Sequence, residues 1–125
     1  MAYAATVTVT RKGNEVVVTI AETEGAAASE ATIELGFTKG VILRQLADKT
    51  AGSASTLDPI LGTASNPSGN TVVIENDTAA DPIDNSWSGG GVTFHTSTGK
   101  LYHRSVPDSG SDNTIATEYH IKVGW

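Results

Sequence analysis

The sequence predicts an all-β protein, folded as a single-domain antiparallel β-sandwich or small barrel with two long Gly/Ser-rich loops. Three observations favour this class. One stretch near the C-terminus alternates apolar and polar residues without a break. Short runs of β-branched residues recur along the chain, separated by clusters of turn-forming residues. Finally, 125 residues suffice for one domain, and no linker divides residues 1–125.

The alternation is clearest in residues 115–125. One set of alternate positions holds Ile115, Thr117, Tyr119, Ile121, Val123 and Trp125. A helix would not place these residues on one face, so the pattern predicts a strand with one buried face. Residues 100–106 predict another strand, and the turn formers between the two runs predict that they pair as a hairpin with a long loop.

The N-terminal region predicts a second hairpin, formed by residues 3–11 and 15–21. Lys12, Gly13 and Asn14 lie between the two runs and suit a tight turn. In the second run, apolar residues fall on both faces. This pattern indicates either a central strand or a strand that a neighbouring subunit covers.

The middle of the chain is less regular. Short strands are expected at residues 31–35, 71–75 and 91–96. Residues 41–49 fit either a short helix or a strand with Val41, Leu43, Gln45 and Ala47 on one face. Because the surrounding pattern is β throughout, a strand is favoured.

Two long loops complete the prediction. Residues 50–70 are rich in small and polar residues, but Leu57, Ile60 and Leu61 interrupt them and are expected to dock on the core. Residues 76–91 form the second loop, which contains Pro82 and Trp87.

Composition narrows the classes of function. The net charge is −6, and Lys and Arg are mostly scattered, which argues against nucleic acid as a partner. The absence of cysteine excludes zinc–thiolate sites, thiol catalysis and disulfides. No secretory signal or membrane-spanning run is recognisable. Aromatic residues make up only 6% of the chain, so a thin core that gains stability from association is expected.

No catalytic motif is found. The three histidines, His95, His103 and His120, have no zinc-binding spacing and are expected to be exposed on the sheet. No Gly-x-Ser-x-Gly turn is present, so a serine-hydrolase site is not predicted. We therefore expect no enzymatic activity, no catalytic residue and no cofactor.

The clustered aspartates are expected to serve their own turns. Asp81 with Asp84, and Asp108 with Asp112, lie among turn formers, where Asx-turns account for them more simply than paired catalytic acids. Asp77, Asp81 and Asp84 could also hold calcium, but the EF-hand spacing is missing. No metal site is therefore predicted.

The two tryptophans are candidates for contact with a partner. Trp87 lies in a polar loop, where it could contact another subunit, dock on its own core or stack on a sugar. Trp125 is in phase with the buried face of the last strand and either closes the core or inserts into a neighbour. With Phe94, Leu57 and Ile60, these residues make up the predicted interface.

Three segments together carry a family resemblance: MAYAATVTVTRKGNEVVVTIAETE at the start, the Gly-Lys-Leu-Tyr and Val-Pro-Asp-Ser-Gly-Ser-Asp-Asn runs within residues 99–113, and the final Ile-Lys-Val-Gly-Trp. They resemble the small β-rich virion structural proteins of tailed bacteriophages, in particular capsid decoration or cement proteins. The resemblance implies a non-enzymatic protein, made in the cytoplasm of the bacterial host, that lies on the capsid surface and bridges capsid subunits. Its implied partners are the major capsid protein and copies of itself, possibly as a trimer, with no nucleic acid or membrane.

Two other functions stay open from the sequence. One is a carbohydrate-binding surface module that uses Trp87, and the other is a head–tail or tail component of the virion.

Overall fold

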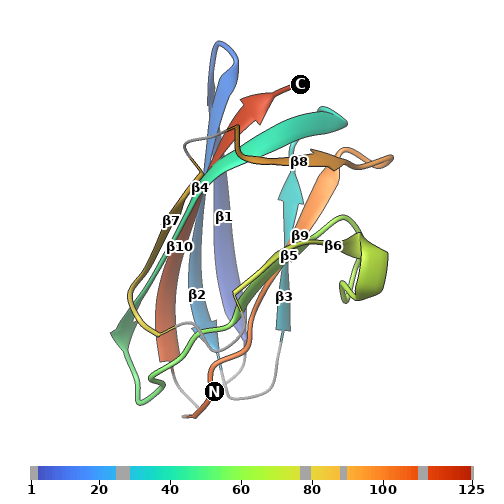
Figure 1. Cartoon of the computed structure of the whole chain (residues 1–125). Coiled ribbons are helices and arrows are strands. Elements are labelled where there is room, and N and C mark those ends of the chain that lie inside the picture. Colours follow the sequence, from blue (N-terminus) through green and yellow to red (C-terminus); the bar gives the residue numbers. More distant parts are fainter. Residues whose placement is uncertain (1–2, 25–28, 77–79, 88–89, 110–112, 125) are drawn as a thin grey trace.

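The computed structural model describes residues 3–24, 29–76, 80–87, 90–109 and 113–124, apart from the side chains of Glu24 and Ser29. Two antiparallel sheets pack face to face (Figure 1). The predicted fold class, an all-β sandwich, is confirmed. The N-terminal hairpin and the C-terminal strand belong to the larger sheet.

Within these residues, sheet A has six strands. Its order is β1 (Ala4–Lys12), β2 (Glu15–Glu24), β10 (Asn113–Val123), β4 (Lys39–Ala51) and β7 (Ile83–Ser86). The sixth strand, β8 (Val92–His95), pairs with the first part of β4, while β7 pairs with a later part. The strands β7 and β8 therefore share one edge of the long strand β4.

Sheet B has four strands within the described residues. Its order is β3 (Ser29–Glu34), β9 (Lys100–Ser105), β5 (Pro59–Gly62) and β6 (Val72–Glu75), and a short 3-10 turn, Gly69–Thr71, precedes β6. The strands β5 and β7 lie inside the two regions predicted as loops. Each has only four residues and a proline at or beside its start, which explains why the sequence pattern missed them.

The main core fills the space between the sheets. Its buried members are Val16, Val18, Ile20, Ala31, Ile33, Leu35, Ile42, Leu61, Ile74, Phe94, Leu101, Tyr119 and Ile121. A second cluster consists of Ala47, Ala54, Leu57, Ile83 and Ile115. Each fully buried Val, Ile or Leu side chain contributes about 1.5–3 kcal/mol to folding, so aliphatic rather than aromatic side chains provide most of the apolar burial.

The predicted N-terminal hairpin is confirmed. The strands β1 and β2 pair in register from Ala4 opposite Thr23 to Lys12 opposite Glu15, which leaves a two-residue loop. The first loop residue, Gly13, has φ +65°, a value that glycine adopts without strain. β2 is internal to the sheet, whereas β1 forms its edge.

The alternation in β10 is also confirmed, but its predicted hairpin with β9 is wrong. Ile115, Tyr119 and Ile121 are at most 1% exposed and face the core. However, β10 lies between β2 and β4 in sheet A, whereas β9 lies between β3 and β5 in sheet B. The connection between them crosses from one sheet to the other. As a result, the buried faces of β9 and β10 meet across the core through the contact between His103 and Tyr119.

Residues 41–49 form part of β4, so the preference for a strand is confirmed. The prediction that Val41, Leu43, Gln45 and Ala47 share one face of this strand is wrong. The pairing with β10 shifts between Arg44 opposite His120 and Ile42 opposite Ile121, which makes Leu43 an extra residue in a β-bulge. On the N-terminal side of the bulge, the residues that face inward change from odd-numbered to even-numbered positions. Ile42 therefore joins the main core in place of Val41.

Candidate functional site

A network of buried polar side chains connects the two sheets through the core. Its central members are Glu22 on β2, His103 and Ser105 on β9, Tyr119 on β10 and Gln45 on β4. All five are at most 1% exposed. Because an unpaired polar group costs free energy in such a place, the hydrogen bonds of each member decide whether the network stabilises the fold.

Glu22 forms one end of the network. Its Oε1 lies 3.0 Å from His103 Nε2 and accepts a hydrogen bond of 2.9 Å from the Ser105 hydroxyl. Its Oε2 accepts a hydrogen bond of 2.8 Å from the hydroxyl of Tyr3. Three donors therefore surround this buried carboxylate.

Tyr119 joins the other side of the imidazole to β4. Its hydroxyl lies 2.7 Å from His103 Nδ1 and accepts a hydrogen bond of 3.1 Å from Gln45 Nε2. Gln45 Oε1 in turn accepts a hydrogen bond from Asn76 Nδ2. Because a carboxylate can only accept, His103 donates its Nε2–H to Glu22, while the Nδ1 atom of the same ring faces the Tyr119 hydroxyl.

The network changes the acidity of two of its members. Burial by itself raises the pKa of Glu22 and is the largest single effect. Attraction to His103, together with hydrogen bonds from His103, Tyr3 and Ser105, outweighs burial and holds the pKa below its ordinary value. Burial is also the main reason that the pKa of Tyr119 is raised well above its ordinary value, which keeps this phenol protonated.

The Ser, His and Glu side chains of this network do not form a hydrolase site. The Ser105 hydroxyl donates a hydrogen bond to the carboxylate, and His103 Nε2 lies 3.0 Å from both that carboxylate oxygen and the Ser105 hydroxyl, so the acid and the serine meet the same ring nitrogen. In a catalytic triad the carboxylate binds the far nitrogen of the imidazole, and the serine is accessible to substrate. Here His103 and Ser105 are both 0% exposed, so the arrangement acts as a structural connection between the sheets.

The prediction that all three histidines are exposed is therefore wrong for His103. It is confirmed for His95, while His120 is half-buried and lies 3.1 Å from Glu118. A signal was available in the sequence, since His103 alternates in phase with Leu101 and is buried with it on the inner face of β9.

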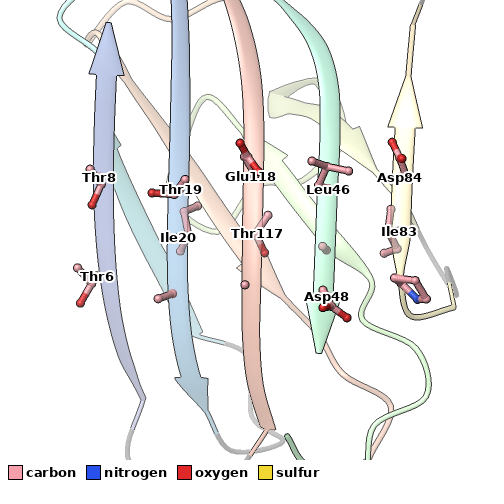
Figure 2. Close-up of a pocket in the computed structure, with 14 residues that line it drawn as sticks. Thr6, Thr8, Thr19, Ile20, Leu46, Asp48, Ile83, Asp84, Thr117 and Glu118 are labelled. Carbon is pink, nitrogen blue, oxygen red and sulfur yellow. The ribbon is translucent and has the colours of Figure 1, made fainter. Parts of the chain in front are cut away.

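The outer face of sheet A carries a broad hollow of about 610 Å³. Figure 2 shows β1, β2, β10, β4 and β7 side by side, with short side chains between them. The residues that line the hollow are Thr6, Thr8, Thr19, Ile20, Ala21, Leu46, Ala47, Asp48, Pro82, Ile83, Asp84, Ala116, Thr117 and Glu118. Most are threonine, alanine or aliphatic, so a partner can approach the sheet closely.

The charged residues that line the hollow itself are acidic. Asp48, Asp84 and Glu118 line the hollow. Asp84 pairs with Arg44 through two hydrogen bonds of 2.9 and 3.1 Å, and the bond from Arg44 is the main reason that the pKa of Asp84 is lowered. Glu118 lies 3.1 Å from His120 and also interacts with the charge of Arg44, whereas Asp48 is exposed, so the hollow itself is weakly acidic with cationic groups beside it.

The aspartates predicted to serve their own turns instead hold distant segments together. Asp81 Oδ1 accepts a hydrogen bond of 2.7 Å from the Lys49 amide. Asp108 accepts bonds from the Ser55 hydroxyl and from the Ser55 and Thr56 amides, which lower its pKa to about 2. In the part of the chain that the structure describes, no three acidic or histidine side chains gather as metal ligands, while Asp77 and Asp112 lie outside it.

The structure does not bring the predicted interface residues onto one face. Leu57 and Phe94 are 0% and 4% exposed and lie in different core clusters. Ile60 on β5 is half-buried, and Trp87 is half-buried and packs against the main core. Trp125 lies outside the described residues. The docking predicted for Leu57 and Leu61 on the protein's own core is confirmed.

Comparison with known proteins adds no family. No protein-family model matches the chain, and no curated protein is significantly similar to it. Among the described residues, no helix has the length and apolar character needed to cross a membrane.

Proposed function

We propose that the protein is a non-enzymatic structural component of a bacteriophage virion, a capsid decoration protein that binds the shell through the outer face of sheet A and bridges capsid subunits. The observation that carries this proposal is the hollow on that face. Residues from five neighbouring strands line it, and most of them are threonine, alanine or aliphatic.

The properties of the hollow suit a protein surface as partner. Threonine and alanine side chains such as Thr19, Ala21 and Ala116 leave the sheet open to close packing, and Leu46 adds an apolar contact. Interfaces of this type combine an apolar centre with a polar rim. Asp48 and Glu118 supply charges that would attract basic groups of the shell.

Weak contacts are sufficient for a protein that binds a lattice. If each bound copy also contacts its neighbours, the second contact becomes intramolecular and the apparent affinity rises without any new interaction. The protein therefore needs neither a deep pocket nor a reactive side chain. The burial of Ser105, His103 and Glu22 in the core is consistent with a structural role.

The test is co-sedimentation with empty shells assembled from the major capsid protein of the same genome. We expect the wild-type protein to sediment with the shells and to raise their melting temperature. Thr19→Lys places a bulky cation in the hollow and should abolish binding. The matched control is Thr32→Lys, at an exposed position on the opposite face of the sandwich, in β3 of sheet B, and it should bind normally. Equal binding by both variants would exclude sheet A as the contact face.

The carbohydrate-binding alternative has less support. Trp87 packs against the main core, and the residues lining the hollow include no aromatic side chain on which a sugar ring could stack. A head–tail or tail position would use the same surfaces, and it is distinguished by where the protein lies on the particle.

A further inference from the structure

We propose that β1 is a self-pairing edge: two copies of the chain join their β1 strands antiparallel about a two-fold axis at Thr8, so that their A sheets become continuous. This inference goes beyond binding to the shell and does not depend on it.

The strand β1 is an unusually open sheet edge. It has nine residues, and in the described part of the chain it pairs only with β2, in a regular register without a bulge. All its residues except Val7 are exposed. Natural edge strands are normally short, bulged or marked by charge or proline along their length, because an open edge pairs with other chains.

The other edges of the described sheets are better protected. β6, β7 and β8 have four residues each. β3 has six, and it carries the carboxylates of Glu30 and Glu34. By contrast, the charges of β1 are confined to Arg11 and Lys12 at one end, so the strand from Ala4 to Thr10 offers an uncharged edge.

The pairing with β2 determines which backbone groups of β1 are free. The two-residue loop makes Lys12 and Glu15 a pair that exchanges hydrogen bonds, so the even-numbered residues of β1 bond to β2. The bond from the Val123 amide to the Asn14 carbonyl agrees, because it shows that the even-numbered residues of β2 point to β10 instead. The odd-numbered residues of β1 therefore direct their N–H and C=O groups to the open edge.

One register uses the whole strand. Pairing residue i with residue 16 − i of the other copy matches all nine positions from Ala4 to Lys12 and places the two-fold axis at Thr8. The odd-numbered residues then exchange hydrogen bonds, as their orientation requires. Arg11 lies opposite Ala5 and Lys12 opposite Ala4, so no like charges meet.

This register also covers an exposed apolar side chain. Val9, at 36% exposed, is the large hydrophobic residue that the described surface leaves open. In the proposed pair it lies directly opposite Val7 of the other copy, and the same contact occurs twice. Cross-strand pairs of β-branched residues stabilise antiparallel sheets. The charge pattern and the exposed valine thus both favour a second copy as the occupant of this edge.

The pair would enlarge the binding face. Thr6 and Thr8 lie at the β1 side of the hollow on the outer face of sheet A (Figure 2). Two-fold pairing brings the hollows of the two copies side by side across one continuous sheet. A two-fold pair differs from the trimer that the family resemblance implies.

The absence of cysteine from the chain allows a direct test by cross-linking. At a position on the axis that is not hydrogen-bonded, the two Cβ atoms lie about 4.5–5.5 Å apart, close enough for a disulfide to form with small adjustment. We expect Thr8→Cys to give a disulfide-linked dimer under mild oxidation. Thr19→Cys, opposite Thr8 on β2 but away from the edge, should remain monomeric on a non-reducing gel.

A second pair of variants tests the register itself. Thr6 of one copy lies opposite Thr10 of the other, so a mixture of Thr6→Cys and Thr10→Cys should cross-link, whereas neither variant alone should.

Light scattering on wild-type protein should give the mass of a dimer, and Val9→Lys should shift it to the mass of a monomer. A wild-type monomer at high concentration, with Thr8→Cys cross-linking no faster than Thr19→Cys, would overturn the proposal. These assays contain no shells, so they can fail or succeed independently of the proposed function.

Discussion

The hydroxyl of Tyr119 is the atom that joins the two halves of the buried network. It contacts His103 Nδ1 at 2.7 Å and Gln45 Nε2 at 3.1 Å. Tyr119→Phe leaves both partners unpaired in the core, at a cost of about 1–3 kcal/mol in the free energy of unfolding. Urea denaturation measures this loss as a lower midpoint with an unchanged slope.

The control for this prediction is Tyr102→Phe. Tyr102 precedes His103 on β9 but is half-buried on the other side of the strand. Its substitution should change the stability by less than about 0.5 kcal/mol. Equal losses for both variants would mean that the buried Tyr119 hydroxyl contributes no more to stability than the half-buried Tyr102 hydroxyl.

The carboxylate of Glu22 should make the stability depend on pH. Its pKa in the folded protein is lowered from the ordinary value of 4.5. The stabilisation is therefore present above pH 4.5 and is lost as the pH falls through the folded pKa, where the native state must take up a proton. Denaturation midpoints measured from neutral to acidic pH should decrease below about 4.5.

Glu22→Gln identifies the source of this dependence. The variant should be less stable than wild type at neutral pH, but should lose less stability on acidification. Glu75→Gln, at an exposed position on β6, should follow the wild-type curve. If Glu22→Gln keeps the full wild-type acid sensitivity, another group is responsible.

At the scale of elements, the docking of β8 on β4 depends on the absence of a side chain at Gly91. A Cβ atom there would lie 2.5 Å from the Ile42 carbonyl oxygen and from Val41 Cγ1. Gly90 and Gly91 both have positive φ, so alanine costs about 1–3 kcal/mol at either position through backbone strain. Only Gly91→Ala adds the collision, because nothing lies within 4 Å of a Cβ at Gly90.

Thermal unfolding of the two alanine variants separates these effects. Gly91→Ala should have the lower melting temperature, because either β8 or the bulge in β4 must move. Similar melting temperatures for both variants would show that strain in the loop, and not contact with β4, limits this region.

The elements that the sequence predicted well are those whose pattern is local. The hairpin of β1 and β2 and the alternation of β10 follow from neighbouring residues and from one glycine, Gly13. The pairing of β9 with β3 and β5 depends on contacts between distant segments, which the pattern in residues 100–106 does not encode. The bulge at Leu43 could not be predicted either. Val41, Ile42 and Leu43 are all apolar, so the sequence shows no alternation from which a change of face could be recognised.

At the scale of the whole molecule, the sequence predicts association, which stays a prediction, and it gives no sign of the hollow on sheet A. Apolar residues such as Leu57 and Phe94 were natural candidates, yet they complete the protein's own core. The hollow on sheet A is made of threonine, alanine and acidic residues from five strands. Ordinary residues of this kind form a site only when strand order brings them together, so no motif could have indicated it.

We propose that the protein binds a capsid shell through the outer face of sheet A. The most direct measurement is a cryo-EM reconstruction of shells to which the purified protein has been added. We expect density for the sandwich at every equivalent surface site, with β1, β2, β10 and β4 turned toward the shell. Density confined to one vertex, a sandwich bound through sheet B, or bare shells would contradict it.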